Sequence, residues 1–304
     1  MKKMRLHIYI VLGIFLVGFI VGSFVELSLS QALFSRDNTF GLTMSAIGTL
    51  PGYMILAVLG GGFFAIGLKK EYKTAWRFVL FVVAVACAGC AIYFSGREFF
   101  GENGFRQYIN IKWVGYLIAL PIAGGCGYLG YYLSKKSNNK YLWLVLAVAA
   151  ACIFLALVPG VTMIKAIFHR PRYRLVEAYS SSNIVSFHNW WQRCKEYKDL
   201  MSAYNISGEE FKSFPSGHAG ASLVFALGVC ILPFVDKKYE KLQLPLFYCG
   251  VAWTLFISFT RILVGAHFLS DVSMGGLLTT VFMLVLNEVL IALNKKYKFE
   301  PELA

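Results

Sequence analysis

Charged residues are scarce in this sequence of 304 residues. Aspartate, glutamate, lysine and arginine make up 15% of it, whereas a soluble domain normally contains about 25%. Hydrophobic residues reach 58%, which excludes a water-soluble globular domain and indicates a polytopic membrane protein. Low-complexity tracts and convincing repeats are absent, and the seven scattered cysteines show no metal-ligand spacing. Only Cys194 lies in a polar stretch, and no disulfide partner for it is evident.

Eight apolar runs are present, and each approaches the roughly 20 residues that cross a bilayer as a helix. The first run is too long for the core of a signal peptide, so we expect it to remain as an uncleaved helix. The sequence therefore predicts an all-α polytopic membrane bundle of about eight transmembrane helices. The runs lie near residues 8–28, 46–68, 76–95, 113–134, 141–164, 217–235, 244–263 and 268–293.

Basic residues gather at the N-terminus and after every second run, while the loops near 30–45 and 96–112 contain few. This positive-inside pattern predicts that both ends of the chain are cytoplasmic. It also explains most of the net charge of +13 without a nucleic-acid partner. The same orientation places Lys165, His218 and His267 together at the outer face. The basic groups are Lys2-Lys3-Arg5, Lys69-Lys70-Lys73, Lys135-Lys136-Lys140, Lys237-Lys238-Lys241 and Lys295-Lys296-Lys298.

One long loop, about 165–216, interrupts this regular layout. Its charges nearly cancel, and it contains the aromatic pair Trp190-Trp191. We expect a small, partly helical extracytoplasmic subdomain with the tryptophan pair at the membrane surface. A mobile linker is the alternative, which the aromatic content disfavours.

Arg261, His267 and Asp271 lie where two apolar runs nearly meet, and charged groups beside hydrocarbon are costly unless they serve a function. His267 and Asp271 are four residues apart, so on a helix they would share a face. A carboxylate beside an imidazole fixes its tautomer, and an arginine offers a planar fork for phosphate. The alternative is a His-Asp pair that caps a buried helix end.

Two further stretches point to an anion site. Phe214-Pro-Ser-Gly-His218 fits a tight turn into a helix, whose free amides suit an anion, with the Ser216 hydroxyl as a further donor. Lys165 and Arg172 lie seven residues apart, and Pro171 should turn the chain out of the membrane near Arg170. Basic residues at a span end can otherwise be anchors for lipid headgroups.

Together the three stretches resemble the type-2 phosphatidic acid phosphatase superfamily, whose soluble members include bacterial acid phosphatases and vanadium haloperoxidases. Its motifs are Lys-x6-Arg-Pro, Pro-Ser-Gly-His and Ser-Arg-x5-His-x3-Asp. Here Lys165 to Arg172, Pro215 to His218, and Arg261 to Asp271 keep the family spacing. Tyr173 replaces the family proline and Thr260 replaces the serine, and both changes spare the charged positions.

The resemblance implies a division of roles. His267 would attack phosphorus to form a phosphohistidine, Asp271 would orient it, and His218 would protonate the leaving oxygen and then activate water. No metal or cofactor is expected, because three basic side chains already face the phosphate. The residues expected to hold the phosphoryl group are Lys165, Arg172, Arg261, Ser216 and Gly217.

Two other readings of these residues exist. His218, His267 and Asp271 could form a non-haem metal site, although three neighbouring basic residues would repel a cation. A non-catalytic lipid-binding or transport protein could keep the same fold.

The resemblance also predicts domains and substrate. We expect residues 1–110 to form two accessory helices and one core helix, 111–293 to complete a six-helix phosphatase core, and 294–304 to be a cytoplasmic tail. An outward-facing site in a bacterial cell membrane suits a lipid phosphate. Undecaprenyl diphosphate, phosphatidic acid and phosphatidylglycerophosphate all present a terminal phosphate there.

Overall fold

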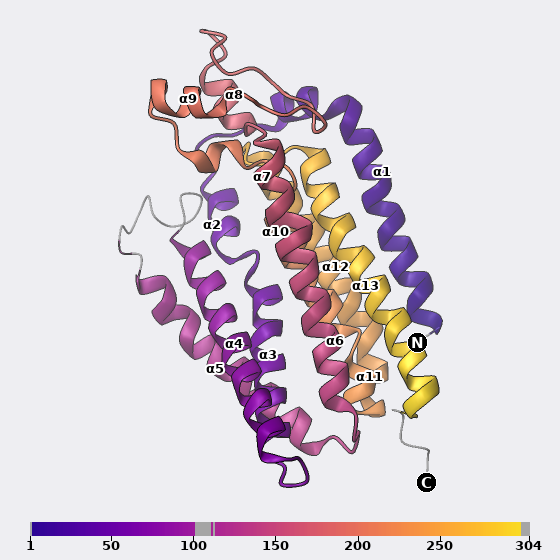
Figure 1. The fold of residues 1–304 in the computed structure, drawn as a ribbon. Coiled ribbons are helices and arrows are strands. Elements are labelled where there is room, and N and C mark those ends of the chain that lie inside the picture. The colour runs from indigo at the N-terminus through magenta and orange to yellow at the C-terminus, as the bar shows by residue number, and fades with distance from the viewer. Residues whose placement is uncertain (1, 101–110, 112, 299–304) are drawn as a thin grey trace.

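The computed structural model describes residues 2–100, 111 and 113–298, and these residues form helices and no strand (Figure 1). Eight helical segments in this part of the chain are long and apolar enough to cross a membrane, so the chain is a multi-pass membrane protein. The predicted all-α class and all eight predicted spans are confirmed. The segments are Met4–Leu33, Thr39–Gly67, Thr74–Phe99, Trp113–Lys136, Leu142–Ala178, Gly217–Val235, Lys237–Leu263 and Leu269–Tyr297.

Several segments consist of more than one helix. The helices of the first half are α1 (Lys2–Leu33), α2 (Thr39–Ile47), α3 (Leu50–Gly67), α4 (Thr74–Phe99), α5 (Trp113–Lys136) and α6 (Leu142–Leu155). A π-helical stretch, η2 (Ala156–Met163), then leads into α7 (Ile164–Phe168), α8 (Tyr173–Ala178), α9 (Tyr197–Tyr204) and the 3-10 turn η3 (Gly208–Phe211). The chain ends with α10 (Gly217–Val229), α11 (Leu232–Val235), η4 (Lys237–Tyr239), α12 (Glu240–Leu263) and α13 (Leu269–Tyr297).

The long helices form two groups. α3, α4 and α5 pack on one another, and α10 packs on α12 and α13, with α3 joining the two groups through α10 (Figure 1). The main apolar core lies between the groups and includes Phe63, Leu227 and Phe247, all fully buried. Because α10 lies at the centre of this core, its first turn is held firmly at one end of the bundle.

The first helix, α1, lies directly against α13 (Figure 1). Gly18 and Gly22 are spaced as a small-xxx-small pair, which lets membrane helices approach closely. A side-chain carbon at Gly18 would lie 2.7 Å from the hydroxyl of Ser273, and one at Gly22 would lie 2.7 Å from the amide of Ser270. The absence of side chains at these positions therefore brings α1 to the start of α13.

The long loop between α7 and α10 folds over one end of the bundle, opposite the end where α1 begins and α13 finishes (Figure 1). As predicted, the loop is partly helical, and it has its own apolar cluster of Leu175, Val185, Cys194, Ile206 and Phe211. Trp190 packs on Phe19 of α1 with 4.8 Å between ring centroids, whereas Trp191 is exposed. These contacts favour the predicted subdomain over the alternative of a mobile linker.

The predicted domain boundaries at residues 110, 111 and 293 stay a prediction. Residues 299–304 of the predicted tail, and most of the predicted loop near 96–112, lie outside the described residues.

Candidate active site

The three sequence motifs meet at the end of the bundle that the long loop covers. Their residues come from α7, from the start of α8, α10 and α13, and from the last turn of α12. They are Lys165, Arg172, Ser216, Gly217, His218, Arg261, His267 and Asp271.

The predicted turn into a helix is confirmed at Ser216, which is the N-cap of α10. Its hydroxyl oxygen accepts a hydrogen bond of 3.4 Å from the Ala219 amide, so the hydroxyl hydrogen stays available as a donor. Lys165 is close by, because a side-chain carbon built on Gly217 would lie 3.7 Å from the lysine Nζ. A helix N-terminus beside an ammonium group favours an anion at this position.

Two buried arginines have guanidinium nitrogens without a partner in the part of the chain that the structure describes. Arg172 is 4% exposed and Arg261 is 0% exposed. Among the described residues, Nε and Nη1 of Arg172 and all three guanidinium nitrogens of Arg261 have no hydrogen-bond partner. Burial of an unpaired guanidinium costs several kcal/mol, roughly, unless an anion compensates it. Such a pair therefore indicates a binding site for a negatively charged ligand with several oxygen acceptors.

His267 lies in the turn before α13, and not on the helix as the four-residue spacing suggested. The turn includes Gly265 at φ +63°, a conformation that glycine adopts without strain. Asp271 sits in the first turn of α13, where its Oδ2 accepts a 2.7 Å hydrogen bond from the Phe268 amide. The carboxylate therefore caps the helix, as the alternative reading proposed, and also lies 3.9 Å from His267 Nδ1.

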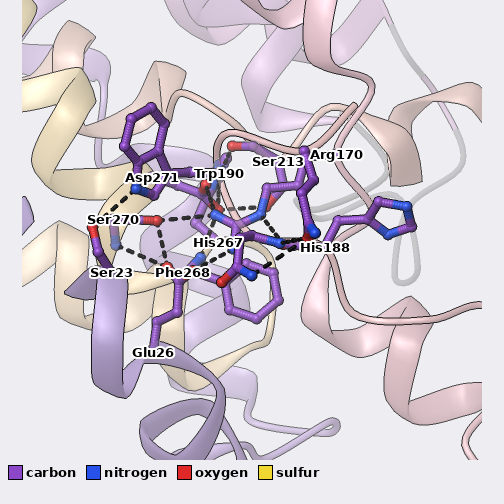
Figure 2. Close-up of polar contacts among 12 residues, drawn as sticks. Ser23, Glu26, Arg170, His188, Trp190, Ser213, His267, Phe268, Ser270 and Asp271 are labelled. Carbon is purple, nitrogen blue, oxygen red and sulfur yellow. Dashed lines mark hydrogen bonds and ion pairs between the residues drawn. The ribbon is translucent and has the colours of Figure 1, made fainter. Parts of the chain in front are cut away.

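The direct partner of His267 is a backbone carbonyl. Nδ1 of His267 lies 2.7 Å from the carbonyl oxygen of Ser213 (Figure 2). A carbonyl oxygen only accepts hydrogen bonds, so Nδ1 carries the proton and Nε2 carries the free lone pair. The sequence predicted that Asp271 fixes the tautomer of His267. This prediction is wrong, because the carbonyl oxygen of Ser213 is the group that fixes it.

Electrostatics keep this imidazole neutral. Burial lowers the pKa of His267 well below its ordinary value of 6.5, and the positive charges of Lys165, Arg172 and Arg261 lower it further. A neutral imidazole with a free Nε2 is the form that can attack an electrophile.

His218 faces His267 across the site, with 6.4 Å between the ring centroids. Its Nε2 lies 3.1 Å from the carbonyl oxygen of Ser45 in α2 and 3.6 Å from the carboxylate of Glu98 in α4. Both partners come from helices outside the three motifs, and the sequence reading missed them. The Glu98 carboxylate is therefore placed to interact with a proton on Nε2 of His218.

Asp271 is held by an arginine that the sequence reading did not assign to the site. Arg170 is fully buried, and its Nη1 donates to Oδ1 of Asp271 at 2.6 Å (Figure 2). Its Nη2 lies 2.5 Å from Oε1 of Glu26, which α1 contributes. Oδ2 of Asp271 also accepts from the Ser213 hydroxyl at 2.5 Å. These contacts form a continuous polar network from α1 to the turn that carries His267.

The two departures from the family motifs, Tyr173 and Thr260, each make contacts of their own. Tyr173 packs edge-on against Phe34 at 5.2 Å and Phe268 at 6.0 Å. The hydroxyl of Thr260 donates to the Ile257 carbonyl within its own helix at 2.8 Å.

The structure brings together a group of possible metal ligands that the sequence reading missed. Donor atoms of His188, Cys194 and Glu196 lie within 4.8 Å of one another in the long loop. Burial raises the pKa of the Cys194 thiol to about 12, and the neighbouring Glu196 raises it further. The predicted alternative, a metal between the two motif histidines and Asp271, does not fit, because both Asp271 oxygens already accept hydrogen bonds from Arg170 and Ser213.

Fold and site together define a multi-pass membrane protein with buried arginines and two histidines gathered at one end of the helix bundle. The family model described as the PAP2 superfamily matches residues 140–294. The chain therefore belongs to this superfamily, the type-2 phosphatidic acid phosphatase superfamily that its three motifs resemble. Members of the superfamily are generally phosphatases, and one embedded in a membrane would act on a lipid substrate. No curated protein and no solved structure matches the chain.

Proposed function

We propose that this protein is a metal-independent lipid phosphatase that removes a terminal phosphate through a phosphohistidine intermediate. The observation that carries the proposal is a pair of buried arginines, Arg172 and Arg261, beside two histidines. Both guanidinium groups have nitrogens without a hydrogen-bond partner among the described residues. Such groups hold the three charged oxygens of a phosphoryl group and stabilise the negative charge that spreads over them in the transition state.

The first step is attack by Nε2 of His267 on phosphorus. The bond between phosphorus and the leaving oxygen breaks, and His218 gives its proton to that oxygen. Lys165 and the amide of Gly217, at the start of α10, contribute further positive potential to the phosphoryl group. Asp271 stabilises the positive charge that develops on His267, with its carboxylate 3.9 Å from Nδ1.

In the second step His218, now neutral, removes a proton from water. The resulting hydroxide attacks phosphorus, the nitrogen–phosphorus bond breaks, and inorganic phosphate leaves. His267 is then neutral again and His218 is protonated again, so the cycle is balanced.

The position of the site at one end of a membrane bundle supports a lipid phosphate as the substrate. The arrangement of basic loops favours the extracytoplasmic face of a bacterial cell membrane. Undecaprenyl diphosphate, phosphatidic acid and phosphatidylglycerophosphate present a terminal phosphate at that level, and the proposed contacts bind only the phosphate.

Phosphate release from each of these lipids by the purified protein in detergent tests the proposal, with His267→Ala as the matched variant. We expect at least one lipid to be hydrolysed by the native protein and none by the variant. Tight lipid binding without phosphate release would instead support the non-catalytic alternative. Loss of activity in EDTA would contradict metal independence.

A further inference from the structure

The first helix supplies a buried carboxylate to the site, although α1 lies outside the matched residues 140–294. Glu26 is 2% exposed, and it lies in a membrane-length helix. Its Oε1 pairs with Arg170 at 2.5 Å, and its Oε2 accepts from the hydroxyl of Ser270 (Figure 2). A carboxylate in such a helix is costly unless it has a role. A helix that only anchors the chain has no need of one.

We propose that Glu26 is a positioning residue for His267 and acts through Arg170 and Asp271. The inference rests on the proposed function, in which His267 is the nucleophile. It makes α1 a working part of the active site and not only an accessory helix.

The contacts form an unbroken path. Glu26 holds Nη2 of Arg170, and Nη1 of the same guanidinium holds Oδ1 of Asp271 at 2.6 Å. Oδ2 of Asp271 accepts a hydrogen bond from the hydroxyl of Ser213. The carbonyl oxygen of the same serine accepts a hydrogen bond from Nδ1 of His267. Every group in the path is buried, so water cannot replace a lost partner without reorganisation.

Glu26 fixes the direction of the Arg170 fork. The guanidinium is planar, and its Nε donates at 2.8 Å to the carbonyl oxygen of His188 in the long loop. The ring of Phe268 lies against it, 4.2 Å from the guanidinium carbon. If residue 26 is neutral, Nη2 of Arg170 loses its charged acceptor. Asp271 is then the remaining carboxylate partner, and the guanidinium can turn toward it. That turn would shift Asp271 and, with it, the carbonyl that orients the nucleophile.

Charge gives the proposal a second consequence. The groups that act on His267 are the cations Lys165, Arg172 and Arg261, the imidazole of His218, and the carboxylate of Asp271. Asp271 also contacts Arg170, and the carboxylate of Glu26 offsets the positive charge of that arginine. Removal of the Glu26 charge makes the surroundings of His267 more positive, which disfavours protonation of the imidazole.

The long loop also rests on α1 next to Glu26. The indole Nε1 of Trp190 donates to the hydroxyl of Ser23 at 2.9 Å.

Near the far end of the α1–α13 pair, Arg5 of α1 pairs with Glu288 of α13, and both side chains are 42% exposed. Glu288 therefore offers a matched control, because it is a carboxylate that joins the same two helices away from the site.

The experiment compares Glu26→Gln, Glu26→Asp and Glu288→Gln in the full chain in detergent. For Glu26→Gln we expect kcat to fall by about tenfold to a hundredfold, as small misplacements of catalytic groups do, with KM nearly unchanged. In a plot of kcat against pH, the fall of kcat on the acid side (the acid limb) should move to lower pH. Glu26→Asp keeps the charge and should keep the limb in place, and Glu288→Gln should match the native protein in both respects. A lower amount of active enzyme with an unmoved limb in Glu26→Gln would show a merely structural role and overturn the proposal.

A double variant covers the case in which Glu26→Gln does not fold. Glu26→Gln combined with Arg170→Gln removes both members of the Glu26–Arg170 pair, and Asp271 keeps its hydrogen bonds from the Ser213 hydroxyl and the Phe268 amide. If Glu26 acts through Arg170, the double variant should be no slower than Arg170→Gln alone. A further loss of kcat in the double variant would show that Glu26 acts by another route.

A readout without turnover separates the two proposals. In protein labelled with ¹⁵N-histidine, His267 should become protonated at lower pH in Glu26→Gln than in the native protein, and His267→Ala identifies its signal. Equal titration in the two proteins would overturn the role of Glu26 while leaving lipid hydrolysis intact. Shifted titration in a protein that hydrolyses no lipid phosphate would instead overturn the proposed function.

Discussion

The carbonyl oxygen of Ser213 lies 2.7 Å from Nδ1 of His267. This contact sets the tautomer of the proposed nucleophile, and the hydroxyl of the same serine donates to Asp271 at 2.5 Å. A single residue just before the Pro-Ser-Gly turn thus connects the second motif with the third. The turn into α10 and the turn that presents His267 are therefore held in one fixed relationship.

The first prediction separates the two histidines. His267→Ala removes the nucleophile and should lower the turnover of lipid phosphate by at least about a thousandfold. His218→Ala keeps the nucleophile but lacks the base for the second step, so a phosphoenzyme should accumulate with an activated substrate. Acid-labile ³²P on the protein measures this species. Near-native hydrolysis by His267→Ala would contradict the mechanism.

Glu98 carries the second prediction, because its carboxylate lies 3.6 Å from Nε2 of His218. If the carboxylate supports His218 as a proton donor, Glu98→Gln should slow the cleavage of a lipid phosphate, whose leaving oxygen needs a proton. Loss of a general acid costs about a hundredfold to ten-thousandfold in rate, and loss of its support should cost less. Cleavage of p-nitrophenyl phosphate should change little, since its leaving group needs no proton. Equal losses on both substrates would rule out this role.

The third prediction concerns orientation. α9 and the C-terminal end of α5 lie at opposite ends of the bundle (Figure 1). In a cysteine-free background, Lys198→Cys in α9 should react with an impermeant thiol reagent added outside intact cells, and Lys136→Cys should not. Both positions are exposed, so burial does not limit the reaction. The reverse result would place the active site in the cytoplasm and remove undecaprenyl diphosphate recycling from the candidate functions.

Sequence alone predicted the eight spans and the three motifs, because an apolar run and a motif spacing are both local signals. A span is a continuous run of apolar residues, and each motif has a fixed spacing. The turn before α13 was harder to predict. Two residues four apart can both lie on one helix. They can also lie on either side of a helix start, as here, where His267 precedes α13 and Asp271 is in its first turn.

The polar partners of the motif residues could not be predicted in the same way. Glu26 and Arg170 are 144 residues apart, and nothing near either residue indicates the other. Arg170 also stands next to Pro171 and two residues before Arg172, and only the family spacing assigned Arg172, and not Arg170, to the phosphate. The structure separates them, because Arg170 is fully paired and Arg172 keeps two unpartnered nitrogens among the described residues.

The last prediction concerns inhibition by vanadate, which adopts the trigonal-bipyramidal geometry of phosphorus during transfer. Arg172 and Arg261 offer buried donors to its equatorial oxygens, and Nε2 of His267 should be its axial partner. Transition-state analogues bind more tightly than substrates, by at least about a hundredfold. His267→Ala should therefore lose vanadate binding although the basic side chains remain. Arg261→Lys should weaken it, because an ammonium lacks the planar fork. Treatment of the protein with EDTA, which is removed before vanadate is added because EDTA itself binds vanadate, should have no effect. Competition between vanadate and the lipid phosphate, measured with and without added divalent metal, checks all three expectations, and a strict need for the metal would contradict the proposed chemistry.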